Sequence, residues 1–141
     1  MKEKKIKEGD LLTQGYPFYA GSVIYKQKIR MDAPSFKERI FLQFQDSQAI
    51  TAKVTINHKE VGLVFWPPYQ IDISSFLKEG ENLIEIELTN SLRNLLGPHH
   101  NNLGEQKWVD TRSFTDETHW VEGYNFIPFG FKRVRLIRAR V

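Results

Sequence analysis

The sequence predicts an all-β domain, an antiparallel β-sandwich of the jelly-roll type, and three observations support this prediction. Several segments alternate apolar and polar residues, which is the period-two pattern of a strand with one face in a core. Segments rich in Gly, Pro, Asn and Asp separate them and favour turns. The chain has 141 residues and no cysteine, so it must bury a sizeable core without disulfide bonds or zinc-thiolate sites.

Two strands are expected in the first third of the chain. Residues 11–20 include three aromatic side chains and suit an irregular entry segment that lies on the core. The strand at 22–31 is interrupted on its apolar face by Gln27, and that face otherwise carries Val23, Tyr25, Ile29 and Met31. After a turn at 32–35, the strand at 39–45 directs three residues inward: Ile40, Leu42 and Phe44.

The segment 51–88 organises the rest of the chain, because it contains two further alternating strands. The first of these strands has four apolar residues on one face: Ile50, Ala52, Val54 and Ile56. A turn is expected at 57–59, since Asn tolerates the left-handed conformation, and Val61 resumes a short strand. The strand at 83–88 has three residues facing the core: Ile84, Ile86 and Leu88.

Between these strands lies an aromatic loop at 65–69, Phe-Trp-Pro-Pro-Tyr, whose prolines cannot donate hydrogen bonds to a sheet. Further along, Ser74 or Ser75 is expected to cap one helical turn that runs through Leu77 and ends at Gly80. A strand, a turn, a decorated crossover and a second strand are typical of an antiparallel sandwich.

Two motifs in this segment resemble a known family. They are V-T-I-N-H-K-E-V-G at 54–62 and Y-Q-I-D-I-S-S-F-L-K-E-G-E-N-L-I-E-I at 69–86. The chain resembles the sugar-binding, galactose-binding-like jelly-roll domain of family 2 glycoside hydrolases and related large glycosidases. His58 and Ser74 stand where that family usually has Gly and Thr, and both changes suit a turn and a cap. The resemblance extends over most of 12–137.

The resemblance implies a non-catalytic, C-terminal accessory module of a larger glycoside hydrolase. Such a module binds carbohydrate or braces the catalytic domain, and the catalytic acids lie in a separate barrel domain. An alternative is a structural or protein-interaction module without affinity for sugar. A third hypothesis, a small stand-alone enzyme, requires two carboxyl groups that face each other in a cleft.

The residues themselves give no catalytic constellation. Four carboxylates lie in the irregular part of the chain without a spacing that pairs them: Asp110, Asp116, Glu117 and Glu122. The sequence has neither a G-x-S-x-G elbow nor a cysteine nucleophile. We therefore expect that this domain is not an enzyme by itself.

Periodicity disappears over 89–125, apart from one short helical turn expected at 91–96 and ended by Gly97-Pro98. Loops of this length are usually functional or disordered. Six apolar residues argue against disorder because they need burial: Leu92, Leu95, Leu96, Trp108, Phe114 and Trp120. We expect an ordered insertion that packs on the sandwich or on something outside it.

Candidate carbohydrate-binding residues fall in two groups. Trp66 and Tyr69 can stack on the apolar face of a sugar ring, with Trp108 and Trp120 as weaker candidates, although such rings can equally cover the ends of the sandwich. The long loop supplies polar residues that can form a recognition surface for a sugar or for a partner domain: Arg93, Asn94, His99 and His100.

No metal site is predicted. His99 and His100 have Asp110 and His119 within twenty residues, but adjacent side chains on an extended chain point to opposite sides. Calcium is a plausible structural ion for a sandwich of this kind, although no acidic cluster demands it. No other cofactor is expected.

The net charge of +3 arises from basic residues at the two ends of the chain. Arg133 and Arg135 alternate with Val134 and Leu136, as on the wet face of an edge strand, so nucleic-acid binding is not predicted. Lysines and glutamates dominate a charged leader at 1–10, which lacks the apolar core of a signal peptide. We expect a soluble protein without membrane contact, either secreted or cytoplasmic. It should form one domain at 11–141, with a long irregular insertion at about 89–125.

Overall fold

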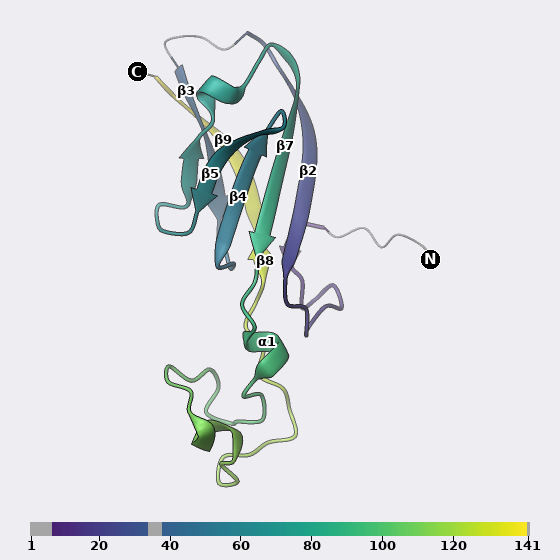
Figure 1. The fold of residues 1–141 in the computed structure, drawn as a ribbon, viewed down its shortest axis with the longest axis vertical. Coiled ribbons are helices and arrows are strands. Elements are labelled where there is room, and N and C mark those ends of the chain that lie inside the picture. The colour runs from purple at the N-terminus through teal and green to yellow at the C-terminus, as the bar shows by residue number, and fades with distance from the viewer. Residues whose placement is uncertain (1–6, 34–37, 141) are drawn as a thin grey trace, which may run out of the picture.

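The structure is a computed structural model that describes residues 7–33 and 38–140, so most of the predicted leader lies outside the described residues. Two antiparallel sheets face each other, with strand orders β2-β7-β4-β5 and β6-β3-β9, and a short β1-β8 pair joins them at one end (Figure 1). The strands are β1 (Gly9–Asp10), β2 (Ser22–Met31), β3 (Glu38–Gln45), β4 (Thr51–Ile56), β5 (Lys59–Val64), β6 (Gln70–Asp72), β7 (Gly80–Thr89), β8 (Gly130–Phe131) and β9 (Arg133–Arg140). The predicted antiparallel β-sandwich is confirmed.

The core lies between the two large sheets and consists of the residues that alternation placed inward. β3, β4 and β7 each bury three alternate residues: Ile40, Leu42 and Phe44; Ala52, Val54 and Ile56; Ile84, Ile86 and Leu88. The prediction for Ile50 is wrong, because this residue precedes β4 and its side chain is exposed. The alternating pattern by itself does not bury a residue. The residue must also lie within a strand that is paired in one of the sheets.

A network of hydrogen bonds made by the side chains of Asn57 and Asn82, which we call the polar knot, fixes the turn between β4 and β5. Asn57 has φ 51°, in the left-handed region, as predicted for this turn. Its side-chain amide donates to the Oδ1 atom of Asn82 at 2.8 Å, and its own Oδ1 accepts from the backbone N–H of Leu83 at 3.0 Å. Asn82 in turn bonds to the backbone of Lys78 and Gly80. The turn is therefore tied to the start of β7.

The short helical turn η1 (Ser74–Phe76) differs from the prediction at both ends. No side chain caps it. Ser74 instead donates its backbone N–H and its hydroxyl to Asp72, at 2.9 and 2.6 Å, and these hydrogen bonds lower the pKa of the Asp72 carboxyl. Gly80 does not end the turn, which is over by Leu77; it begins β7 with φ 87°.

At the other end of the sandwich, the pairing of β1 with β8 leaves no room for a side chain at Gly130. Gly9 pairs with Phe131 and Asp10 with Gly130. A Cβ atom at Gly130, which has φ 139°, would lie 2.2 Å from the carbonyl oxygen of Gly9. Gly130 also exchanges two backbone hydrogen bonds with Gln48. This position therefore admits no side chain without displacing the backbone.

Most of the long segment between β7 and β8 lies outside the sandwich, although Phe129 at its end is buried in the core. In Figure 1 it extends below the two sheets as a separate lobe, and we call residues 90–129 the projecting loop. It contains α1 (Arg93–Leu96), where a helical turn was predicted, and the 3₁₀ turn η2 (Thr111–Phe114). None of the helices among the described residues has the length and apolar character that crossing a bilayer requires.

Candidate functional site

The aromatic loop after β5 exposes one ring and anchors another. Trp66 is 76% exposed, and its neighbour Phe65 is also exposed. Tyr69 is half-buried and packs against the core, while its carbonyl oxygen accepts a hydrogen bond from the backbone N–H of Phe44 at 2.8 Å. The loop therefore presents the face of Trp66 to solvent on a backbone that is attached to β3.

An aromatic cluster forms the upper part of the projecting loop, around the two predicted histidines. The ring of His99 lies 5.2–5.9 Å from three aromatic rings: Phe18, Tyr124 and Phe126. The ring of His100 stacks on Trp120, with centroids 5.6 Å apart. The Nδ1 atoms of His99 and His100 bond to the carbonyl oxygens of Asn125 and Val121, at 3.0 and 3.1 Å. Both imidazoles therefore hold the segment 121–125, where the loop returns toward the sandwich, in place.

Arg93 and Asn94 also bond within the loop. Arg93 forms a bidentate ion pair with Glu105, through Nε at 3.0 Å and Nη2 at 2.5 Å. Asn94 is only 1% exposed. Its amide donates to the carbonyl oxygen of Ile127 at 2.8 Å, and its oxygen accepts from the N–H of the same residue at 2.9 Å. Asn94 thus joins the outgoing and returning ends of the projecting loop, which we call its neck, and its amide is turned away from solvent.

The structure does not bring the six predicted binding residues to one place. Trp66 and Tyr69 lie beside the sandwich, on the connection from β5 to β6, whereas Arg93, Asn94, His99 and His100 lie in the lobe below it (Figure 1). Of the six, Trp66 has the most exposed aromatic ring. The other five take part in packing or hydrogen bonds within the domain.

The projecting loop exposes many large apolar side chains. Trp108 is 90% exposed. Eight further large apolar residues of the loop are exposed: Leu92, Leu95, Leu96, Leu103, Val109, Phe114, Trp120 and Tyr124. We call these nine residues the apolar set. Six of them are the residues that we expected to need burial, and the sandwich does not cover them, because the loop extends away from the two sheets.

Two of the four carboxylates predicted in the loop, Asp110 and Asp116, lie near each other and have different partners. Asp110 and Asp116 both line a shallow hollow of about 400 Å³. Asp110 accepts from the backbone N–H groups of Arg112 and Ser113 and so caps η2. Asp116 is held by His119 at 2.7 Å, a hydrogen bond that lowers the pKa of its carboxyl. The pKa of a general acid is usually raised, and the pKa of the Asp116 carboxyl is shifted in the opposite direction.

Metal ligands are also dispersed. Within residues 7–33 and 38–140, no three His, Cys, Asp or Glu side chains are grouped so that they could hold an ion. His99 and His100 engage different carbonyl groups, as their opposite directions on the chain require.

Comparison with known proteins places this fold within larger glycosidases. No protein-family model matches the chain. A putative β-glucuronidase from Formosa agariphila is 29% identical over 84 residues, which make up 59% of this chain and 7% of that protein. A rhamnosidase structure from Novosphingobium sp. PP1Y is similar to 86% of this chain over 11% of its own length, with a TM-score of 0.64 and 22% identity.

Two β-glucuronidase structures are similar in the same way. The FMN-binding enzyme of Faecalibacterium prausnitzii L2-6 matches 89% of this chain and the enzyme of Bifidobacterium dentium 92%, both with a TM-score of 0.55 and with 16% and 19% identity. The matched parts are 17% and 23% of those two chains. The chain therefore has the fold of a domain that forms a small part of larger proteins.

Proposed function

We propose that this domain is a non-catalytic accessory module of a larger glycoside hydrolase, of the galactose-binding-like jelly-roll kind. Its projecting loop packs against the catalytic domain and braces it. The matched relatives are named as glycosidases, and the proposal extends this association to the present chain. This chain matches only a small part of each relative, so the rest of the relative has room for a separate catalytic domain.

The apolar set on the projecting loop is the observation that carries this proposal. Exposed apolar patches with polar rims typically mark protein–protein interfaces, and exposed Trp residues often supply most of the binding energy. The loop is also internally braced, by Asn94 and Ile127 at its neck and by Arg93 and Glu105 beside α1. A preorganised apolar surface loses less conformational entropy when it binds than a flexible one does.

The test compares one substitution in two contexts. Trp108→Ala is introduced into the isolated domain and into the glycoside hydrolase polypeptide that contains this chain or is encoded beside it. In the isolated domain we expect a change below about 0.5 kcal/mol in the free energy of unfolding, because the exposed ring contacts little. In the larger protein or complex we expect a loss of about 2 kcal/mol, as for a residue at the centre of an interface.

Trp66→Ala is the matched control, since it removes an exposed Trp that lies outside the projecting loop. It should have the same small effect in both contexts. Urea unfolding followed by circular dichroism measures all four changes. If Trp108→Ala has equal effects with and without the catalytic polypeptide, the bracing function is wrong.

Carbohydrate binding at Trp66 is the second candidate function, and the exposure of that ring favours it. We expect a saturable change in tryptophan fluorescence with one member of a panel of galactosides, glucuronides, rhamnosides and xylans. Trp66→Ala should weaken the binding about tenfold or more, because stacking on the ring is lost. Trp108→Ala should retain it. The absence of a saturable change with every sugar would contradict this candidate.

A further inference from the structure

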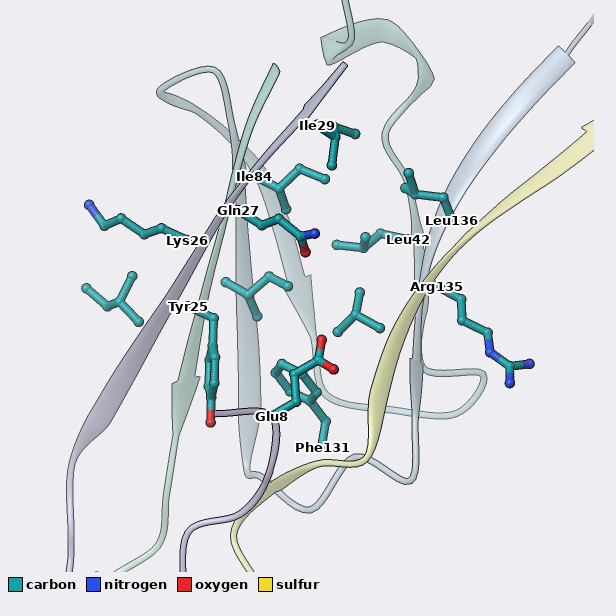
Figure 2. Close-up of a pocket in the computed structure, with 13 residues that line it drawn as sticks. Glu8, Tyr25, Lys26, Gln27, Ile29, Leu42, Ile84, Phe131, Arg135 and Leu136 are labelled. Carbon is teal, nitrogen blue, oxygen red and sulfur yellow. The ribbon is translucent and has the colours of Figure 1, made fainter. Parts of the chain in front are cut away.

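One flank of the sandwich is open. Figure 2 shows a cavity of about 720 Å³ between β2 and β9, which are edge strands of different sheets. Its inner wall is apolar: Leu42, Ile84 and Ile86 belong to the core, and Val134 and Leu136 come from β9. Two charged residues, Glu8 and Arg135, also line the cavity. Leu136 lies opposite the buried Leu42 in the register, yet it is 40% exposed. The core therefore reaches solvent here.

Gln27 occupies the mouth of this cavity. It interrupts the inward face of β2, between Tyr25 and Ile29, and it is exposed although both of its neighbours on that face are partly buried. A polar residue at an inward position is explained when that position borders an opening instead of a closed core.

β9 offers a free edge beside the same opening. It pairs with β3 on one side only, so the sandwich has four strands in one sheet and three in the other. β1 pairs with β8, which directly precedes β9 in the chain. Among the described residues, however, β1 does not continue along β9. Both backbone groups of Lys7 are taken by the side chain of Gln14, at 2.8 and 3.0 Å. In the part of the chain that the structure describes, no strand pairs with the edge of β9 that faces the opening, and this edge can accept another strand.

The charge on β9 indicates the chemistry of that strand. Register with Gln45 and Gln43 puts Arg133 and Arg135 on the outer face, where both are exposed. No described residue forms an ion pair with either of them, whereas Arg138 lies 3.8 Å from Glu38. Opposite charges directly across a pair of strands are stabilising and like charges are destabilising.

We propose that the open flank binds an extended acidic peptide segment of another polypeptide. The segment adds to the free edge of β9 as a fourth strand. Its alternate apolar side chains enter the cavity over Leu136, Ile84 and Ile86, and its acidic side chains face outward beside Arg133 and Arg135. Main-chain hydrogen bonds supply affinity in this mode of recognition, and the alternate side chains supply specificity. This surface is separate from the projecting loop and does not depend on the proposed function.

The probe is a fluorescein-labelled peptide of eight residues that alternates Glu with Val, matching the eight residues of β9. A scrambled peptide and a peptide with Lys in place of Glu are measured beside it. We expect saturable anisotropy with the alternating Glu peptide only, and weaker binding at higher salt. Amide chemical shifts in the NMR spectrum should change along β9 and β2 and not along β5.

The double variant Arg133→Glu with Arg135→Glu should weaken the Glu peptide at least tenfold and allow the Lys peptide to bind. Lys59→Glu with Arg112→Glu carries the same change in charge on exposed residues away from the flank, and it should bind the Glu peptide as the unaltered domain does. Equal binding of the scrambled peptide, binding of none, or occupation of the edge by a second copy of the domain in sedimentation experiments would overturn the proposal.

Discussion

Asn82→Ala is expected to lower the free energy of unfolding by about 3–5 kcal/mol, the largest effect of a single truncation that we predict. The side chain of Asn82 is 0% exposed, and its amide makes four hydrogen bonds of 2.7–3.2 Å. Truncation leaves the N–H and C=O groups of Lys78 and the C=O group of Gly80 without this partner. It also removes one of the hydrogen bonds of the side chain of Asn57, whose left-handed backbone forms the β4–β5 turn.

Urea unfolding at neutral pH measures this loss. Asn102→Ala is the control, because Asn102 is an exposed residue of the projecting loop and its change should stay within about 0.5 kcal/mol. A loss below about 1 kcal/mol for Asn82→Ala would mean that the polar knot contributes little. The sandwich would then depend on its apolar core alone.

Gly130→Ala is expected to destabilise the domain by about 3 kcal/mol or more. Two costs coincide at this position: φ 139° is strained for a residue with a side chain, and the new Cβ would lie 2.2 Å from the carbonyl oxygen of Gly9. Relief requires β1 to separate from β8, which would also disturb Leu11, a fully buried residue that donates its N–H to Phe129.

Gly123→Ala provides a matched comparison, since its Cβ would meet nothing within 4 Å and its φ carries no such restriction. We expect its effect on the free energy of unfolding to be within about 0.5 kcal/mol. If the two substitutions have similar effects in thermal and urea unfolding, close packing at the β1–β8 junction does not stabilise the fold.

The strands could be predicted from the sequence because their alternation reflects a property of each segment by itself. Ile84, Ile86 and Leu88 are buried whichever strand pairs with β7, because one side of that strand must face a core. The interruption at Gln27 was visible in the sequence too. Its meaning was not, since it depends on whether a facing strand exists.

The candidate site was harder to predict because exposure depends on three-dimensional context. Trp108 and Asn94 lie in the same irregular loop, and their residue types suggest burial for the first and exposure for the second. The structure shows the opposite, because Asn94 pairs with Ile127, 33 residues away, and Trp108 lies on a lobe without a facing surface. No local sequence pattern encodes the pairing of Asn94 with a distant residue or the lack of a surface that faces Trp108.

The pairing of β3 with β9 joins residues that are far apart in the chain, from Glu38↔Arg140 to Gln45↔Arg133. During synthesis, β3 therefore lacks this neighbour until β9 has left the ribosome. The four strands of the other sheet are complete by Thr89 and can pair earlier. Such long-range pairing slows folding and leaves one backbone edge of β3 unpaired in the meantime. That unpaired edge is a site at which nascent chains can pair with one another and aggregate.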